Sequence, residues 1–213
     1  MSKRLHCLTL LLAAMLVFRG AAQAEDNDAR LAREATQLFQ AVLRDEAIHV
    51  SACMFPKKWN TEPVPESSAR RYLGLRPHGD LVSAFHGKSE ADILGAAGLP
   101  ATAFCDDDAH SATIQTRLRG EMVGPGTDAA GAKARCLVDM RENFSFPIFD
   151  DGYHRAIIVL ASDASSYRQG PDAKPVSIGA NGSIGGLVYA KHAGLWRRVT
   201  TEGYAFFDGP GCR

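Results

Sequence analysis

Residues 155–162, with the sequence RAIIVLAS, decide the fold class of this chain. The centre of this stretch, IIVL at 157–160, is a continuous apolar run rich in β-branched residues. A short run of this kind is typical of a strand that is buried on both faces. The preceding residues 149–152, FDDG, form a turn signal. The sequence therefore predicts a central strand that begins directly after a tight turn.

The C-terminal side of this strand predicts one more pair of strands. Residues 165–183 are polar and glycine-rich, and we expect a loop there. Residues 186–191 (GLVYAK) and 195–201 (LWRRVTT) flank His192, Ala193 and Gly194. Two strand-like segments around a short turn with glycine indicate a hairpin.

Two stretches before the central strand alternate between apolar or small residues and mostly polar residues. They are 114–122 (IQTRLRGEM) and 133–141 (KARCLVDMR), and the glycine-rich segment 124–131 joins them. Period-two alternation is typical of a strand with one buried face. The two stretches together predict a first hairpin.

Helical patterns occur before residue 105. Residues 25–46 carry an apolar stripe at spacings of three and four, with Asn27 or Asp28 available as a cap. Residues 67–75 predict a short helix. Ser89 followed by Asp92 is typical of a helix start, and that helix would end near Gly98. The stripe of the first helix consists of Leu31, Ala35, Leu38, Phe39, Val42 and Leu43.

Helices that precede a meander of strands predict a single α+β domain, with a helical half at 25–105 and a sheet half at 110–207. A parallel α/β fold would need helices between the strands. Rolls of the cystatin-like or nuclear-transport-factor-like type have this order of elements. That analogy concerns the fold alone and implies no function.

Residues 1–24 have the pattern of a cleaved signal peptide. Lys3 and Arg4 precede an apolar run at 8–18, and AQA at 22–24 supplies small residues where signal peptidase cuts. This apolar run is too short for a membrane span, which needs about 20 residues. We therefore expect a periplasmic or secreted chain that begins at Glu25 and has no membrane span after cleavage.

Charge and cysteine content fit an exported globular protein. The full chain has 24 basic and 24 acidic side chains, and removal of Lys3, Arg4 and Arg19 leaves 21 against 24. This balance gives no indication of nucleic-acid binding.

Export favours two disulfides among the four remaining cysteines. Of the three possible connectivities we favour Cys53 with Cys105, and Cys136 with Cys212.

Glycines and acids occur in two patterns that partly resemble ligand sites. Residues 179–186 (GANGSIGG) are glycine-rich but lead into a strand, whereas a phosphate loop leads into a helix. Residues 106–108 (DDD) with His110 lack the ligand spacing of a calcium or zinc site. We therefore expect neither a cofactor nor a metal.

Catalytic motifs of the common hydrolases do not occur in the sequence. His154 lies close to Asp150, Asp151 and Tyr153, and these four residues are the best candidate for an acid–base cluster. The cluster falls on the predicted turn, where a histidine is usually solvated. We therefore assign no catalytic residue and favour a protein that is not an enzyme.

The outer face of the first predicted hairpin is our candidate binding surface. Alternation would place five basic residues on this face, and arginine forks match carboxylates and phosphates. The surface would then suit a protein or other anionic partner in the cell envelope; a solvated, aggregation-resistant face is the alternative. The five residues are Arg117, Arg119, Lys133, Arg135 and Arg141.

A further segment resembles the C-terminal half of many uncharacterised secreted proteins and lipoproteins. The resemblance covers residues 145–196 and is carried by SFPIFD at 145–150, AIIV at 156–159, GGLVY at 185–189, Lys191 and GLW at 194–196. Those proteins have no agreed activity, so the resemblance implies no particular function.

These observations favour an exported, non-enzymatic protein that binds another macromolecule, as an inhibitor, an immunity protein or an accessory factor would. The alternative is a small hydrolase or small-ligand-binding protein with a site in the concave face of the sheet. The inner face of the sheet distinguishes the two. Side chains such as Leu118, Val138 and Ile158 would fill it in the first case, and a pocket lined by His154, Tyr189 or Asp150 is expected in the second.

Overall fold

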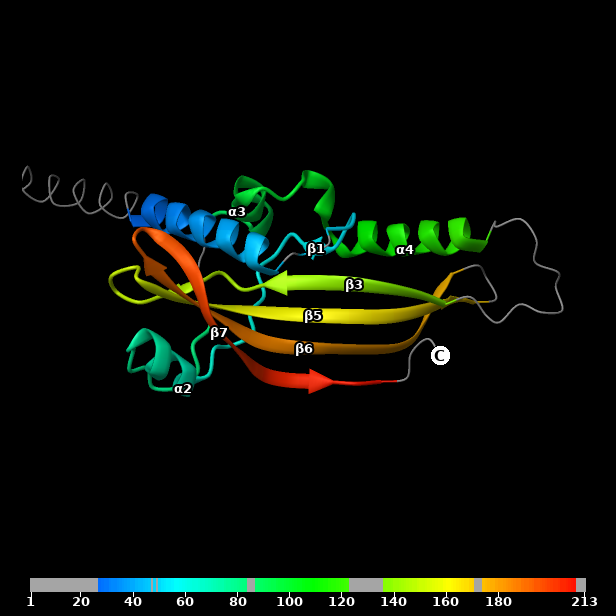
Figure 1. The fold of residues 1–213 in the computed structure, drawn as a ribbon. Coiled ribbons are helices and arrows are strands. Elements are labelled where there is room, and N and C mark those ends of the chain that lie inside the picture. Colours follow the sequence, from blue (N-terminus) through cyan, green and yellow to red (C-terminus); the bar gives the residue numbers. More distant parts are fainter. Residues whose placement is uncertain are drawn as a thin grey trace, which may run out of the picture.

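The protein has an α+β fold, which confirms the predicted class. The computed structural model describes residues 27–209, with gaps at 47, 49, 84–86, 123–135 and 171–173. Most of the helices precede a C-terminal antiparallel sheet of five strands (Figure 1). The predicted signal peptide lies outside the described residues.

The sheet has the strand order β3-β5-β6-β7, and the short strand β4 also pairs with β5. The strands are β3 (Cys136–Phe144), β4 (Ile148–Phe149), β5 (Arg155–Gln169), β6 (Pro175–His192) and β7 (Leu195–Phe207). All neighbours in this sheet are antiparallel. The predicted central strand is confirmed as the first half of β5, and the predicted final hairpin is confirmed as β6 and β7.

The helices lie where the apolar spacing predicts them, with one addition. A helix over 27–46 is followed by α2 (Glu66–Ser68), which continues as a π-helix (Ala69–Leu73), and by α3 (Glu90–Ala97). The addition is α4 (Asp107–Met122). Within the described residues, no helix is both long enough and apolar enough to cross a membrane.

Ser89 caps α3 as predicted. Its hydroxyl accepts a hydrogen bond from the backbone N–H of Asp92, and the Asp92 carboxylate accepts one from the N–H of Ser89, which completes a capping box. The helix ends at Gly98, whose positive φ of 123° is a conformation that favours glycine.

Two further short strands, β1 (Phe55–Pro56) and β2 (Phe104–Cys105), form a separate parallel pair. A single 3-10 turn (Ala101–Ala103) precedes β2.

The predicted strand at 114–122 is wrong, because these residues form most of α4. Asp106 Oδ1 accepts a hydrogen bond of 2.9 Å from the N–H of Ala109, which caps the helix and fixes its start. His110, Ile114 and Leu118 are buried, and a spacing of four residues puts them on one helical face. The first hairpin therefore does not form, and β3 pairs with β5 instead.

The predicted loop at 165–183 is also wrong over most of its length. β5 continues to Gln169 and β6 begins at Pro175. The two strands pair continuously from Arg155 and Ala190 outward, with one register shift near Ser166. Serine, glycine and alanine have a low intrinsic preference for strands, but cross-strand hydrogen bonds that extend an established ladder override it.

Two apolar clusters cover opposite faces of the sheet near the start of β5. Ala156 and Ile158 pack under the helix 27–46 and α3, while Ile157 and Val159 pack against the π-helix segment. This arrangement follows from the alternation of side chains along a strand. The inner face of the sheet is therefore filled at this end, and the space for a ligand lies at the edge of the sheet.

Candidate functional site

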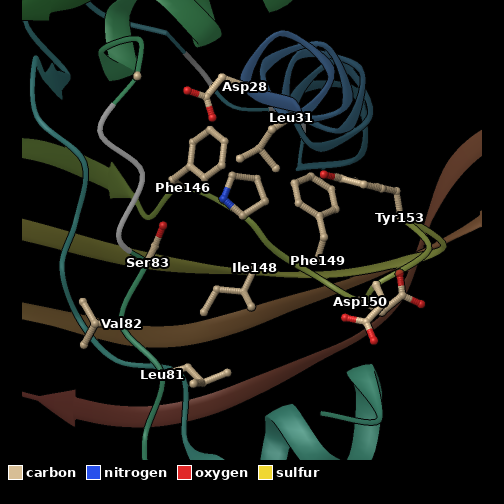
Figure 2. Close-up of a pocket in the computed structure, with 13 residues that line it drawn as sticks. Asp28, Leu31, Leu81, Val82, Ser83, Phe146, Ile148, Phe149, Asp150 and Tyr153 are labelled. Atoms are coloured by element: carbon tan, nitrogen blue, oxygen red, sulfur yellow. The ribbon is translucent and has the colours of Figure 1, made fainter. Parts of the chain in front are cut away.

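A cleft of about 760 Å³ opens where the N-terminal helix meets the edge of the sheet (Figure 2). Asp28 and Leu31 from the first turns of that helix form one wall. Leu81 and Val82, from the extended segment 81–83, form the other wall. The floor between these walls is the chain segment 146–149, which includes β4.

Proline explains why the sheet changes at the floor of the cleft. The ladder between β3 and β5 stops at Phe144 and resumes at Ile148, and Pro147 in the interval has no N–H to donate. Ser145 bridges the break, because its N–H donates to the carbonyl of Val159 at 2.7 Å and its hydroxyl accepts the Val159 N–H at 2.9 Å. The edge of the sheet is therefore displaced but still firmly held.

The cleft extends around both sides of the β4 edge. Figure 2 shows the rings of Phe146 and Phe149 on the side of the N-terminal helix, and Ile148 on the side of Leu81. Phe149 contacts Tyr153, with ring centroids 5.2 Å apart. Ile148 packs with the second apolar cluster, to which Leu81 also belongs. The floor therefore presents alternate side chains to the two walls.

The rim of the cleft is acidic. Asp28 and Asp151 are exposed, whereas Asp150 Oδ1 accepts hydrogen bonds from the N–H groups of His154 (2.7 Å) and Arg155 (3.1 Å). Asp150 thus holds the turn that Tyr153 completes with a positive φ of 57°. The carboxylates of Asp28 and Asp151 remain as the groups that could attract a cation.

In the candidate acid–base cluster, the imidazole of His154 makes no hydrogen bond to the carboxylate of Asp150. The contact between His154 and Asp150 uses the backbone N–H of the histidine, and its imidazole lies against Gly152, where an added Cβ would meet Nδ1 at 2.4 Å. Asp150, Asp151 and Tyr153 line the cleft. Tyr189 is buried in the core beneath the N-terminal helix.

The acidic stretch 106–108 begins α4 and is a helix start. His110 Nε2 lies 2.7 Å from Asp139 Oδ2, and both residues are buried at the junction of α4 with β3. Within the described part of the chain, no group of three or more histidine, cysteine, aspartate or glutamate side chains could hold a metal ion. The glycine-rich stretch 179–186 lies within β6.

The five basic residues do not share a hairpin face, because α4 replaces the predicted strand. Arg117 and Arg119 lie on the helix, and Arg117 hydrogen-bonds to Asp139. Arg141 pairs with Asp107 at 2.8 Å. Lys133 and Arg135 fall outside the described residues. A binding role for these residues stays a prediction.

Cys53 and Cys105 lie next to each other as free thiols. The Cys105 thiol donates a hydrogen bond of 3.7 Å to the carbonyl oxygen of Cys53, and the Thr113 hydroxyl approaches Cys53 Sγ at 3.5 Å. The sulfur of Cys136 and all of Cys212 fall outside what the structure describes. Both predicted disulfides therefore stay predictions.

Sequence reasoning missed the cleft as a site. It named Asp28 only as a helix cap and Asp150 and Asp151 only as parts of a turn with a candidate acid–base cluster, because neither pattern reveals that these residues line one cleft with Asp28. It also missed Glu90, which is fully buried although it occupies the first turn of α3, where acids are usually solvated.

Comparison of the chain with models of protein families, with curated proteins and with solved structures finds no match. Function must therefore be inferred from the α+β fold and from the cleft at the edge of its sheet.

Proposed function

We propose that this chain is an exported, non-enzymatic protein that binds another protein through the cleft at the β4 edge. The observation that carries this proposal is the composition of the cleft. Its floor and walls are apolar, its rim holds the carboxylates of Asp28 and Asp151, and the carboxylate of Asp150 is occupied by its own turn. Such a site offers binding energy from buried apolar area, with charge to select the partner.

The chemistry of the cleft defines the partner. Apolar side chains would pack on Leu31, Val82 and Ile148, and a lysine or arginine would be attracted to Asp28 or Asp151. A partner segment of alternating apolar residues with a basic residue nearby fits both features. The expectation of an anionic partner would apply to a different surface, since this rim is acidic.

A small apolar ligand is the second candidate, and the size of the cleft favours it. Pockets that bind small molecules usually enclose roughly 300–1,000 Å³, and this cleft has about 760 Å³. Its position differs from the sequence-based alternative, because it lies at the edge of the sheet and not in the concave face. A fragment screen by ligand-observed NMR tests this candidate, and competition by a bound peptide would show that both use the same cleft.

Selection of peptides tests the main proposal. Random heptapeptides displayed on phage would be selected on the chain 25–213, and we expect enrichment of apolar residues with lysine or arginine. Val82→Asp places a charge on the apolar wall and should weaken peptide binding at least roughly tenfold, which corresponds to about 1.4 kcal/mol.

The matched control is Val199→Asp on β7, at the opposite edge of the sheet. The two valines are comparably exposed to solvent. A substitution at an exposed site usually alters the free energy of unfolding by about 0.5 kcal/mol or less. Both variants should therefore fold, and a difference in binding between them reports on the cleft. Failure to select any peptide, or equal binding by the two variants, would contradict the proposal.

Export is tested separately. We expect the chain recovered from the periplasm or medium to begin at Glu25, because signal peptidase cuts after small residues such as those at 22–24. Intact-mass measurement checks this directly. A full-length product in the membrane fraction would refute export by cleavage.

A further inference from the structure

We infer that a second cavity, at the C-terminal end of the π-helix Ala69–Leu73, binds a small organic molecule through its phosphate or carboxylate group. The cavity has a volume of about 500 Å³ and shares no described lining residue with the cleft at the β4 edge. It therefore provides a binding site that goes beyond the proposed function. The residues that line it are Arg70, Gly74, Leu75, Arg76 and His78.

The cavity is built on an unusual turn of the chain. Arg70 lies within the π-helix, Gly74 ends this helix with a positive φ of 70°, and the chain then continues through Leu75 and Arg76 to His78. A Cβ added at Gly74 would meet no atom within 4 Å apart from its neighbours in the chain. The backbone at this turn is therefore open to a ligand. π-helical turns are rare and occur frequently at functional sites.

A mostly buried carboxylate holds the π-helix on the sheet. Figure 1 shows α2, which the π-helix continues, on the opposite side of the sheet from the N-terminal helix. Glu202 of β7 accepts hydrogen bonds from the hydroxyls of Ser68 (2.5 Å) and Tyr72 (2.9 Å). The same carboxylate pairs with the Arg71 guanidinium at 3.2 Å. These donors are therefore used within the protein, and they fix the turn that carries the cavity.

The positive charge of the cavity is only partly neutralised. Arg70 pairs with Glu66, and Asp80 accepts a hydrogen bond of 2.9 Å from the backbone N–H of Glu66. Among the described residues, Arg76 and His78 take part in no hydrogen bond or ion pair, and no residue that lines the cavity is acidic. An anionic group in the cavity would give both side chains a partner. A guanidinium fork matches phosphate and carboxylate oxygens, and an imidazole N–H donates to them as well.

The volume of the cavity indicates a molecule larger than a simple ion. Sites for small molecules usually enclose roughly 300–1,000 Å³. A bare phosphate or acetate ion is only a few times the size of a water molecule, which takes about 30 Å³, and would leave most of this space empty. The side chain of Leu75 offers apolar contact to the rest of the ligand. The ligand class is therefore a compact organic anion.

Titration of the isotope-labelled protein with phenyl phosphate and with benzoate, followed by NMR, tests this assignment. We expect at least one probe to bind, to shift the amide signals of Arg76 and His78, and to bind more weakly at higher ionic strength. Arg76→Gln removes the unpaired charge and should raise the Kd at least roughly tenfold. Arg76→Lys keeps the charge without the fork and should raise the Kd less. The probe that binds more tightly identifies the anionic group as phosphate or carboxylate.

The matched control is Arg197→Gln on β7. Arg197 is also exposed and takes part in no hydrogen bond or ion pair among the described residues, but it does not line the cavity. This variant should change the Kd by less than about twofold, because its charge lies outside the site. Should Arg76→Gln fail to fold, comparison of Arg76→Lys with Arg197→Lys provides the same test.

Three results would overturn the inference. The first is the absence of binding by both probes, and the second is an equal loss of binding in the variants at Arg76 and Arg197. The third is binding of inorganic phosphate or acetate as tight as that of the corresponding organic probe, because the cavity would then hold an adventitious ion only. None of these results bears on the cleft at the β4 edge, which is tested by Val82→Asp.

Discussion

Replacement of Glu90 with glutamine is expected to stabilise the protein by about 3 kcal/mol at pH 7. Glu90 is 0% exposed; its Oε1 accepts the Phe144 N–H at 3.4 Å, and its Oε2 has no hydrogen-bond partner among the described residues. Burial raises the pKa of Glu90 from 4.5 to about 9, and this outweighs the hydrogen bond from Phe144 and the charge of Arg141. At pH 7 the carboxylate is ionised in the unfolded chain and must take up a proton when the chain folds, which costs free energy. The amide of glutamine is neutral in both states and has no such cost.

The sign of the pH dependence follows from the raised pKa. The folded state holds the Glu90 proton more tightly than the unfolded chain does. Its contribution to stability is therefore fully present below pH 4.5 and is lost as the pH rises towards 9. The advantage of Glu90→Gln should be near zero at pH 4 and largest at alkaline pH.

Thermal unfolding of both proteins across this pH range measures the effect. An increase in melting temperature of roughly 6–12 °C at pH 7 corresponds to about 3 kcal/mol in a domain of this size. The control is Glu62→Gln, which changes an exposed glutamate and should have little effect at any pH. A variant that is less stable than the wild type at pH 7 would show that Glu90 is ionised and needed as an anion beside Arg141.

The sequence predicts the fold correctly where the apolar residues follow a single pattern, typical either of a helix or of a buried strand. The stripe of the first helix and the apolar run at the start of β5 each fit a single structure. Ile114 and Leu118 fit both a strand and a helix. Their spacing of four residues is even, as on one face of a strand, and is also close to one helical turn. The hydrogen bond from Ala109 to Asp106 and the burial of His110 favour the helix, and only the three-dimensional structure shows the contact between His110 and Asp139.

The candidate site could not be predicted because its parts are far apart in sequence. Asp28, Val82 and Ile148 come together only when the N-terminal helix, the segment 81–83 and β4 are assembled. The contacts along a sheet edge are also invisible in a sequence, since they depend on where neighbouring segments run. Among the described residues, the segment beside β3 makes a bridge between Asn60 and Ser145. Pro147 is the one local signal, because proline in a sheet marks an edge or an irregularity.

Oxidation of Cys53 and Cys105 to a disulfide is expected to stabilise the protein by about 4 kcal/mol, the value for a closed loop of roughly 50 residues. The Cys105 thiol already lies 3.7 Å from the Cys53 carbonyl oxygen. The Cys53 N–H also donates a hydrogen bond of 3.0 Å to the Thr102 carbonyl, which holds the two chain segments side by side. We therefore expect that the two sulfurs can meet without a large movement of the backbone.

The two thiols should differ in reactivity. Burial, together with the neighbouring Cys53, raises the pKa of Cys105 to about 12, so its thiol stays protonated at neutral pH. Cys53 is only half-buried, so a reagent in solution reaches its sulfur more readily than that of the buried Cys105. An alkylating reagent applied to the reduced, folded protein should therefore modify Cys53 first. Equal modification of both residues would contradict this order.

Comparison of the wild type with the double variant Cys53→Ser, Cys105→Ala isolates this bridge from any bond between Cys136 and Cys212. Under oxidising conditions the wild type should unfold at a higher temperature than the variant, and a reductant should remove most of that difference. Peptide mapping without reduction should recover residues 53 and 105 in one linked fragment. Two free thiols at these positions under oxidising conditions would refute the bridge, and the contact between Cys105 and Cys53 would then contribute through packing alone.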